Sequence, residues 1–399
     1  MRHFLVIIFS LALSLTASAQ MSNLIKAKKL IGRTDKLEEA RSLVKTAMDS
    51  TATRDLADTY YLAGRIEWGA YDKNSKANSI TPGAVNKIDV ARQLLNGYRY
   101  FDKAVSMDTA KNKKGIPSPK FTKEIHKRMA DKINDFDYAA SIFFNDPEKK
   151  NYMAAYDAYM IFADSPYRKE GKTIPDSLKA KIYFTAGRAA WNDGEYEKAA
   201  AAFGKARQIE TEDPMACIYE IASWLQVQQK NPAREQDAKN AILMAAKDGY
   251  QKFGLSNPYI IHNLINTMIH DGQSREAVDF LTSAIAENPD RSELYGLRAF
   301  VYDYLKDDAN SEKDYRQYAS MHNVSYDTMR DAIYKLVSIG SKKWEALELK
   351  DPQLNAKKND LKANYFLEAK KWIEKMNSPS NHPGDFDDIL EIIYYHINQ

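Results

Sequence analysis

The stretch KIYFTAGRAAWNDGEYEKAAAAFGKARQIETEDP, residues 181–214, decides the fold class of this chain. Its first half carries the small pair Ala186-Gly187, and the pattern Ala199-x3-Phe203-x2-Ala206 begins thirteen residues after Ala186. Spacings of three and four place residues on one face of a helix. Small residues let two helices approach closely, and a larger residue one turn away fills the gap between successive helix pairs. The stretch therefore predicts two helices packed as a hairpin.

This 34-residue unit resembles the tetratricopeptide repeat, with the small pair in place of the family's Leu-Gly and the second pattern at the family's spacing. It departs from the family at Tyr183, where the signature has Trp, at Ala190, where it has Tyr, and in a late Pro214. None of these changes removes an essential packing role. The resemblance implies an all-α protein whose hairpins stack into a right-handed superhelical solenoid.

The same spacing recurs along the chain and gives seven recognisable repeats. Besides the first, four repeats keep the thirteen-residue step: Ala27 to Ala40, Val44 and Ala47; Ile142 to Ala155, Tyr159 and Phe162; Leu264 to Ala277, Leu281 and Ala284; and Arg298-Ala299 to Ser311, Tyr315 and Tyr318. Two repeats carry insertions: Ala222 reaches Ala238, Ile242 and Ala245 late, and Ala63-Gly64 reaches Gly97, Phe101 and Ala104 later still. Each hairpin has an apolar face that only a stacked neighbour can bury.

We expect one solenoid over residues 20–323, with insertions near 72–92, 108–120 and 164–176. Beyond it, residues 324–399 contain three helix-like stretches, at 326–347, 358–375 and 385–397, which match the repeat poorly. Terminal elements of repeat arrays are commonly atypical caps. The sequence therefore predicts a degenerate repeat followed by C-terminal capping helices.

The first nineteen residues have the pattern of a secretory signal peptide. Arg2 and His3 precede an apolar run over residues 4–15, and Ala17-Ser18-Ala19 follows it. The run is about a dozen residues long, short of the roughly twenty that a transmembrane helix needs. We expect cleavage after Ala19 and an exported, soluble protein, periplasmic or associated with the outer membrane. The cysteine of a lipid anchor is missing from this site.

Charge and cysteine content exclude some function classes. Removal of Arg2 with the signal leaves 56 basic and 54 acidic residues, so no sequence-wide charge attracts nucleic acid. We therefore expect no nucleic-acid partner. The one cysteine, Cys217, cannot form an intramolecular disulfide and is expected in the core.

The sequence carries no catalytic constellation. H-E-x-x-H, G-x-S-x-G, the P-loop, G-x-G-x-x-G and C-x-x-C are all absent from it. His262 and His270 lie eight residues apart on an expected helix, roughly 12 Å along its axis, which is too far to share one metal ion. We expect a non-catalytic protein with no cofactor and no metal site.

In the tetratricopeptide-repeat family the first helix of each hairpin lines the concave surface, so positions beside its buried stripe are the candidate partner contacts. They form five sets: Tyr61, Arg65 and Trp68; Phe184, Arg188 and Trp191; Glu220, Trp224 and Val227; His262, Asn266 and Ile269; and Gly296, Phe300 and Asp303. Two sets share an aromatic, Arg, Trp order, which could hold an extended chain. Alternatively, the aromatic residues pack against the next hairpin and Arg covers them.

Some family members clamp a chaperone's C-terminal carboxylate with a Lys and Asn pattern, which is missing here. The matching positions hold Tyr61, Phe184 and Glu220, and Arg65, Arg188 and Trp224. A cytosolic chaperone adaptor is therefore disfavoured.

The sequence favours a scaffold in the envelope of a Gram-negative bacterium that binds segments of envelope proteins. The alternative is a glycan-binding component of an outer-membrane uptake system, since helical sugar-capture proteins also contain such repeats and use aromatic platforms. An enzyme or enzyme subunit built on the repeats is a third hypothesis, weakened by the missing constellation.

Four tripeptides resemble the O-glycosylation acceptor of some Gram-negative envelope proteins: Asp, then Ser or Thr, then an aliphatic residue, Met or Thr. Their acceptor residues would be Ser50, Thr109, Ser177 and Thr328. Asp, Ser and Thr also gather at loops and helix caps for structural reasons. Both interpretations stay open at the level of sequence.

Overall fold

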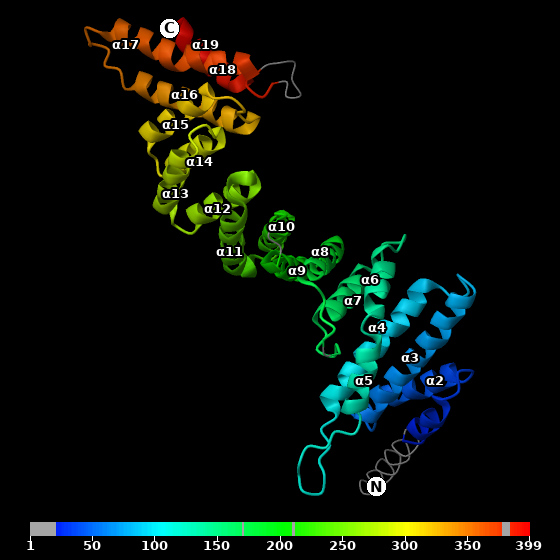
Figure 1. Ribbon diagram of the computed structural model, residues 1–399. Helices are drawn as coiled ribbons and strands as arrows, with labels where there is room; N and C mark the ends of the chain where they lie inside the picture. Colours follow the sequence, from blue (N-terminus) through cyan, green and yellow to red (C-terminus); the bar gives the residue numbers. More distant parts are fainter. Residues whose placement is uncertain (1–20, 170, 210–211, 377–383) are drawn as a thin grey trace, which may run out of the picture. The chain divides into compact units, whose positions relative to one another are not determined.

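The computed structural model describes residues 21–169, 171–209, 212–376 and 384–399. This part of the chain is all-α, and its one extended pairing is an isolated bridge between Lys111 and Pro117 (Figure 1). The predicted signal peptide, residues 1–19, lies outside the described residues. Among the residues described, no helix combines the length and the apolar character that crossing a membrane requires.

The chain divides into two compact units, with the boundary between Lys230 and Asn231. The described part of unit 1 starts with a helical segment at residues 21–30. It continues with α2 (Leu37–Met48), α3 (Ala57–Ile80), α4 (Lys87–Met107), α5 (Thr122–Lys132), α6 (Asp135–Phe144), α7 (Tyr152–Asp164), α8 (Asp176–Asn192), α9 (Tyr196–Ile209) and α10 (Met215–Lys230).

Unit 2 consists of hairpins followed by a group of covering helices. Its elements are η1 (Pro232–Arg234), α11 (Glu235–Phe253), η2 (Gly254–Ser256), α12 (Pro258–His270), α13 (Ser274–Glu287), α14 (Ser292–Tyr304), α15 (Asp308–Ser320), α16 (Tyr326–Glu345), α17 (Leu354–Leu361), the π-helical segment η3 (Lys362–Leu367), α18 (Glu368–Met376) and α19 (Asp387–Asn398).

Helices that follow one another in the chain pack on one another within each unit. In unit 1 the most extensive contacts join α3 to α4 and α8 to α9, and α6, α7, α9 and α10 pack on their sequence neighbours. In unit 2 contacts run in sequence from α11 to α16, and α12 also contacts α14, the first helix of the next hairpin. The architecture is thus an all-α array of stacked helical hairpins.

The positions that define the predicted repeats lie in the core. In the 181–214 repeat, Ala186, Ala199, Phe203 and Ala206 are at most 1% exposed. Corresponding residues of the other repeats are buried too, except for the half-buried Ile142, Ala222 and Arg298. A Cβ built on Gly187 would lie 2.7 Å from the Phe203 ring, so the small residue is required for the helices to approach.

The three predicted insertions take different forms. Most of the insertion near 72–92 is helical and lengthens α3 and α4. Residues 108–120 form a loop, which Asp108 closes by accepting hydrogen bonds from the backbone N–H groups of residues 120–122. These hydrogen bonds hold the pKa of Asp108 below its usual range against the opposing effect of burial. The third insertion, near 164–176, connects α7 to α8.

The last helices of unit 2 cover α16. The π-helical segment η3 joins α17 to α18 without a break, and α19 packs against both η3 and α16. Phe366, Ile373 and Ile393 from these segments are at most 1% exposed and share a core with residues of α16. The last helices therefore share one apolar core with α16 and with residues of α14 and α15, among them Ala299 and Tyr318.

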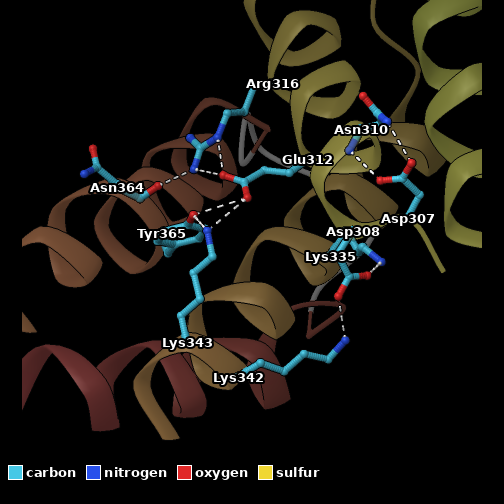
Figure 2. Close-up of polar contacts among 10 residues, drawn as sticks. All are labelled: Asp307, Asp308, Asn310, Glu312, Arg316, Lys335, Lys342, Lys343, Asn364 and Tyr365. Atoms are coloured by element: carbon cyan, nitrogen blue, oxygen red, sulfur yellow. Dashed lines mark hydrogen bonds and ion pairs between the residues drawn. The ribbon is translucent and has the colours of Figure 1, made fainter. Parts of the chain in front are cut away.

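Ionic contacts fasten α15 to this end of the unit (Figure 2). Asp308 accepts hydrogen bonds from Lys335 at 2.7 Å and from Lys342 at 2.9 Å, both on α16. Glu312 pairs with Arg316 one turn along α15, at 2.9 Å, and with Lys343 of α16 at 3.6 Å. Tyr365 of η3 also donates to Glu312 (Figure 2). The carboxylates Asp308 and Glu312 thus connect α15 to α16 and η3.

Candidate functional site

A cleft of about 580 Å³ opens on unit 2 along the first helices of three consecutive hairpins, α12, α14 and α16. Its volume is within the range of about 300–1,000 Å³ that is typical of ligand sites. The walls include His262 and Asn266 from α12, Glu293 and Phe300 from α14, and Asp327 and Asp331 from α16.

Close packing between α14, α15 and α16 forms the base of the cleft. A Cβ on Gly296 would lie 2.6 Å from the methyl group of Thr328, so these two helices approach as closely as a glycine allows. Tyr318 of α15 is buried, and its hydroxyl accepts the backbone N–H of Ser325 at 2.5 Å. Ser325 in turn caps α16 by accepting the N–H of Thr328. The first turn of α16 is therefore held in place beside the cleft.

The cleft is acidic. Three carboxylates, Glu293, Asp327 and Asp331, contribute to its lining, and no Lys or Arg is found among the described residues that line it. Arg291 donates to Glu293 at 2.6 Å, and Arg330 lies 3.9 Å from Asp327. Two of the carboxylates thus have a cation beside them.

Partial desolvation shifts the pKa of two lining side chains, although both are exposed in the cleft. It raises the pKa of the Asp331 carboxyl, which the Arg330 guanidinium opposes. It lowers the pKa of the His262 imidazolium, which the Glu293 carboxylate opposes. Because an unperturbed histidine titrates near pH 6.5, His262 is mostly neutral at pH 7 and does not offset the carboxylates.

Four predicted concave positions meet in this cleft: His262, Asn266, Gly296 and Phe300. The side chains of His262 and Asn266 are exposed, and Phe300 is 43% exposed. Whether they contact a partner stays a prediction.

The remaining members of the α12 and α14 sets, Ile269 and Asp303, contact other residues of unit 2. Ile269 is 2% exposed, which makes it a core residue rather than a partner contact. Asp303 does not line the cleft: it accepts the Ser311 hydroxyl at 2.5 Å and forms an ion pair with Lys335 at 2.6 Å. The Asp303 carboxylate therefore contacts α15 and α16 and not the cleft.

On α3 the structure corrects the prediction of an open surface, because α5 covers that face. Tyr61 and Trp68 are buried, with 7% and 3% of their area exposed. The Tyr61 ring stacks on Phe121 with centroids 4.3 Å apart, and its hydroxyl donates to Glu124 of α5 at 2.7 Å. The Trp68 indole N–H donates to the Leu94 carbonyl at 2.9 Å. Both are core residues.

Arg65 belongs to the same covered face. It is half-buried, donates to the Tyr61 hydroxyl at 2.8 Å and lies 3.4 Å from the Glu124 carboxylate. Its guanidinium is therefore paired within unit 1.

The α8 set is partly covered by aromatic packing. Phe184 is half-buried, with its ring edge-on to Tyr219 at a centroid distance of 5.7 Å. Trp191 is also half-buried and edge-on to Tyr219, at 6.2 Å. The exposed Arg188 lies over the Phe144 ring at 5.4 Å. This arrangement favours packing between hairpins, the alternative raised for these aromatic residues.

On α10 the structure makes Glu220 part of the core. Glu220 is 4% exposed, and its carboxylate lies 2.6 Å from Nε of Arg207 on α9, a residue that is also buried. It therefore joins two helices and does not face a partner. Val227 is buried as well, at 4%, whereas Trp224 is half-buried and stays a predicted contact.

The helix that covers α3 was missed by the repeat search, although the sequence contains a signal for it. Ile125, Met129 and Ile133 recur every fourth residue, which predicts one apolar helical face. All three are at most 2% exposed. The concave-position rule also missed Asp327 and Asp331, because it was not extended to the degenerate repeat.

Candidate acceptors of O-glycosylation differ in exposure. Thr109 and Ser177 are exposed, while Ser50 is half-buried and its hydroxyl accepts the N–H of Ala52. Thr328 is half-buried in the cleft, and its hydroxyl accepts a hydrogen bond from Ser325. Thr109 and Ser177 are therefore the more accessible of the four.

No cluster of three or more His, Cys, Asp or Glu side chains within the described ranges has a geometry that could hold a metal ion. Cys217 is fully buried in α10. His262 and His270 are both exposed on α12.

The chain matches no protein-family model and no curated protein. Similar solved structures exist. The tetratricopeptide-repeat domain of P58(IPK) is 15% identical over 79% of this chain and 97% of its own, with a TM-score of 0.19. The human IFIT1 dimer with PPP-AAAA is 15% identical over 87% of each chain, with a TM-score of 0.33. Naa15/Naa10 bound to HypK-THB is 12% identical over 94% of this chain and 71% of its own, with a TM-score of 0.26.

Proposed function

We propose that this chain is a non-catalytic scaffold that binds protein partners in the cell envelope, with the cleft between α12, α14 and α16 as its partner-binding surface. One observation carries the proposal. The first helices of three consecutive hairpins form a single cleft, and the side chains of His262, Asn266 and Phe300 are exposed in it. A partner bound there would contact several hairpins at once.

The length of the surface suits a polypeptide segment. Packed helices lie about 8–10 Å apart, so three of them in a row span roughly 20 Å. An extended chain rises about 3.3 Å per residue, so about six residues would cross the cleft. Phe300 supplies an exposed aromatic ring in this cleft, a residue type that is enriched at protein-binding surfaces.

Export is part of the proposal, and it comes from residues 1–19. Their short basic start, apolar run and Ala17-Ser18-Ala19 site support secretion and cleavage. Fractionation of cells that produce the full chain, followed by N-terminal sequencing, tests this. A mature protein that begins at Gln20 in the periplasmic or outer-membrane fraction is expected. A cytoplasmic protein that retains residues 1–19 would contradict it.

Photo-crosslinking tests the cleft itself. A photoreactive phenylalanine analogue in place of Phe300 should give discrete adducts with a protein partner in living cells. Tyr304 provides a matched control, because it is an exposed aromatic residue one turn along α14 that does not line the cleft. Adducts from position 304 alone, or none from position 300, would count against the cleft as the binding surface.

A second candidate function, glycan binding, is favoured by one pocket of unit 1. The pocket, of about 280 Å³, lies between the lengthened α3–α4 hairpin and α6. Tyr138, 63% exposed, lies among its lining residues with Tyr71, Lys87 and Asp135. An exposed ring beside polar groups suits a sugar. A glycan array with the wild-type chain and Tyr138→Ala tests this, and no bound glycan would rule it out.

A further inference from the structure

We propose that the cleft on unit 2 binds its partner through one Lys or Arg side chain, which forms an ion pair with Asp331, while a neighbouring apolar side chain of the same extended segment lies on Phe300. This inference rests on the proposed function, since it assigns the chemistry of the segment that the cleft would bind.

Asp331 differs from the other carboxylates of the cleft in its surroundings. Glu293 and Asp327 each have an arginine from their own helix or its start within 4 Å. The carboxylate of Asp331 forms no ion pair or hydrogen bond with another residue of the described chain. Burial also raises the pKa of its carboxyl, so a cation from outside would stabilise the charged form.

The lysine one turn further along α16 does not fill this role. Lys335 lies four residues after Asp331, a spacing at which helical side chains can pair. Its ammonium instead contacts Asp303 at 2.6 Å and Asp308 at 2.7 Å, the second of which is drawn in Figure 2. With two carboxylates already bound, Lys335 does not pair with Asp331, and Arg330 pairs with Asp327.

An apolar contact lies in the same cleft. Phe300 is 43% exposed, and Leu297, 6% exposed, lies beside it in the lining. Lys and Arg side chains combine an apolar stem with a charged end, so they match a surface on which an aromatic ring and a carboxylate occur together. Asp331 is exposed in the free protein, and a neutral or acidic segment bound in the cleft would cover its carboxylate without pairing it.

The arrangement does not fit a bound metal ion. Calcium takes about six to eight oxygen ligands and magnesium needs octahedral coordination. Across the described residues no group of three or more potential ligands has suitable geometry. A single carboxylate without an ionic partner is sufficient for one ammonium or guanidinium group.

Selection of random peptides tests the inference without knowledge of the natural partner. Phage-displayed heptapeptides are selected on the immobilised mature chain, and the selected peptides are measured by fluorescence anisotropy against four proteins: wild type, Asp331→Asn, Asp290→Asn and Phe300→Ala. Asp290 is the matched control, an exposed aspartate that does not line the cleft. Circular dichroism establishes that each variant is folded.

Peptides that bind the cleft should carry a Lys or Arg next to an apolar residue. Asp331→Asn should weaken their binding about tenfold or more, the usual effect of losing a charged hydrogen-bond partner. Asp290→Asn should leave it unchanged. Replacing the peptide's basic residue by Met should cause the same loss, and combining it with Asp331→Asn should cause little more.

Other outcomes overturn the inference in distinguishable ways. Cleft-binding peptides that lose affinity with Phe300→Ala but not with Asp331→Asn would disprove the basic residue and leave the proposed function intact. If no selected peptide responds to either substitution, the cleft is not the binding surface and both proposals fail. If free arginine amide displaced a bound peptide as effectively as the unlabelled peptide does, the cleft would bind a small cation and not a polypeptide segment.

Discussion

The ring of Phe101 on α4 lies directly against the backbone of Gly64 on α3. A Cβ built on Gly64 would be 2.7 Å from Cδ1 of Phe101, closer than side-chain carbons approach in folded proteins. The same relationship joins Phe203 of α9 to Gly187 of α8. Both phenylalanines are fully buried. Glycine and phenylalanine together therefore set the distance between the helices of these two hairpins.

Gly64→Ala should destabilise unit 1 by about 1–3 kcal/mol, because the added methyl group forces the ring or the helices apart. Gly69→Ala is the matched control in the same helix: its Cβ would meet Leu37 at an ordinary contact distance of 3.4 Å. That variant should be neutral or up to about 1 kcal/mol more stable, since alanine favours helix over glycine. Urea unfolding followed by circular dichroism measures both. A Gly64→Ala protein as stable as wild type would contradict the packing described.

Trp68→Ala should lower the free energy of unfolding by about 3–5 kcal/mol, because it removes a buried indole together with its hydrogen bond to the Leu94 carbonyl. Phe300→Ala provides the contrast, since the exposed ring of Phe300 should contribute no more than about 0.5 kcal/mol to stability. Thermal unfolding of both variants beside wild type decides the matter. An unchanged unfolding midpoint in Trp68→Ala would show that Trp68 is a surface residue and not part of the core.

Trp68 and Phe300 show which features of the fold can be predicted from the sequence and which cannot. The repeat pattern predicted the all-α hairpin architecture and the buried packing positions, since a helix period and small-residue spacing are local properties. It also placed Phe300 and His262 on one open face. It failed for Trp68 because the repeat spacing does not show that this indole turns toward α4, where it donates to the Leu94 carbonyl and packs edge-on against Phe101.

Glu220→Gln should destabilise the contact between α9 and α10 by up to about 3 kcal/mol, because it replaces a charged partner of the buried Arg207 guanidinium by a neutral one. Replacing the pair together, as Arg207→Met with Glu220→Leu, should recover much of that loss. A double-mutant cycle from urea unfolding gives the coupling free energy. Losses that simply add would show that the two side chains act independently.

The imidazole of His396 should make the end of unit 2 sensitive to acid. His396 is 6% exposed and stacks on Phe366 with centroids 4.2 Å apart, and its Nδ1 has no hydrogen-bond partner among the described residues. Burial lowers its pKa, partly opposed by Glu345, while Ser341 contacts Nε2 at 3.2 Å. The folded state therefore favours the neutral ring.

Because the folded pKa is depressed, the contribution of His396 to stability is complete above its unfolded pKa of about 6.5 and decreases as the pH falls below that value. Urea unfolding near pH 7.5 and near pH 5.5 should show a larger decrease for wild type than for His396→Phe, whose ring does not titrate. The other titrating groups are common to both proteins and cancel in the comparison. Equal decreases would mean that folding does not lower the pKa of His396.

The π-helical segment at residues 362–367 gives the end of the chain a tolerance for changes in length. A π turn holds one residue more than an α turn, and the regular helices on either side keep their own buried faces: Leu361 before it, and Ala369 and Trp372 after it. Loss of the exposed Ala363 would turn the segment into ordinary α-helix with the same residues inside. A deletion within α18 would rotate the following residues by about 100°. A gene for this protein can thus lose one codon here while the last core keeps its residues.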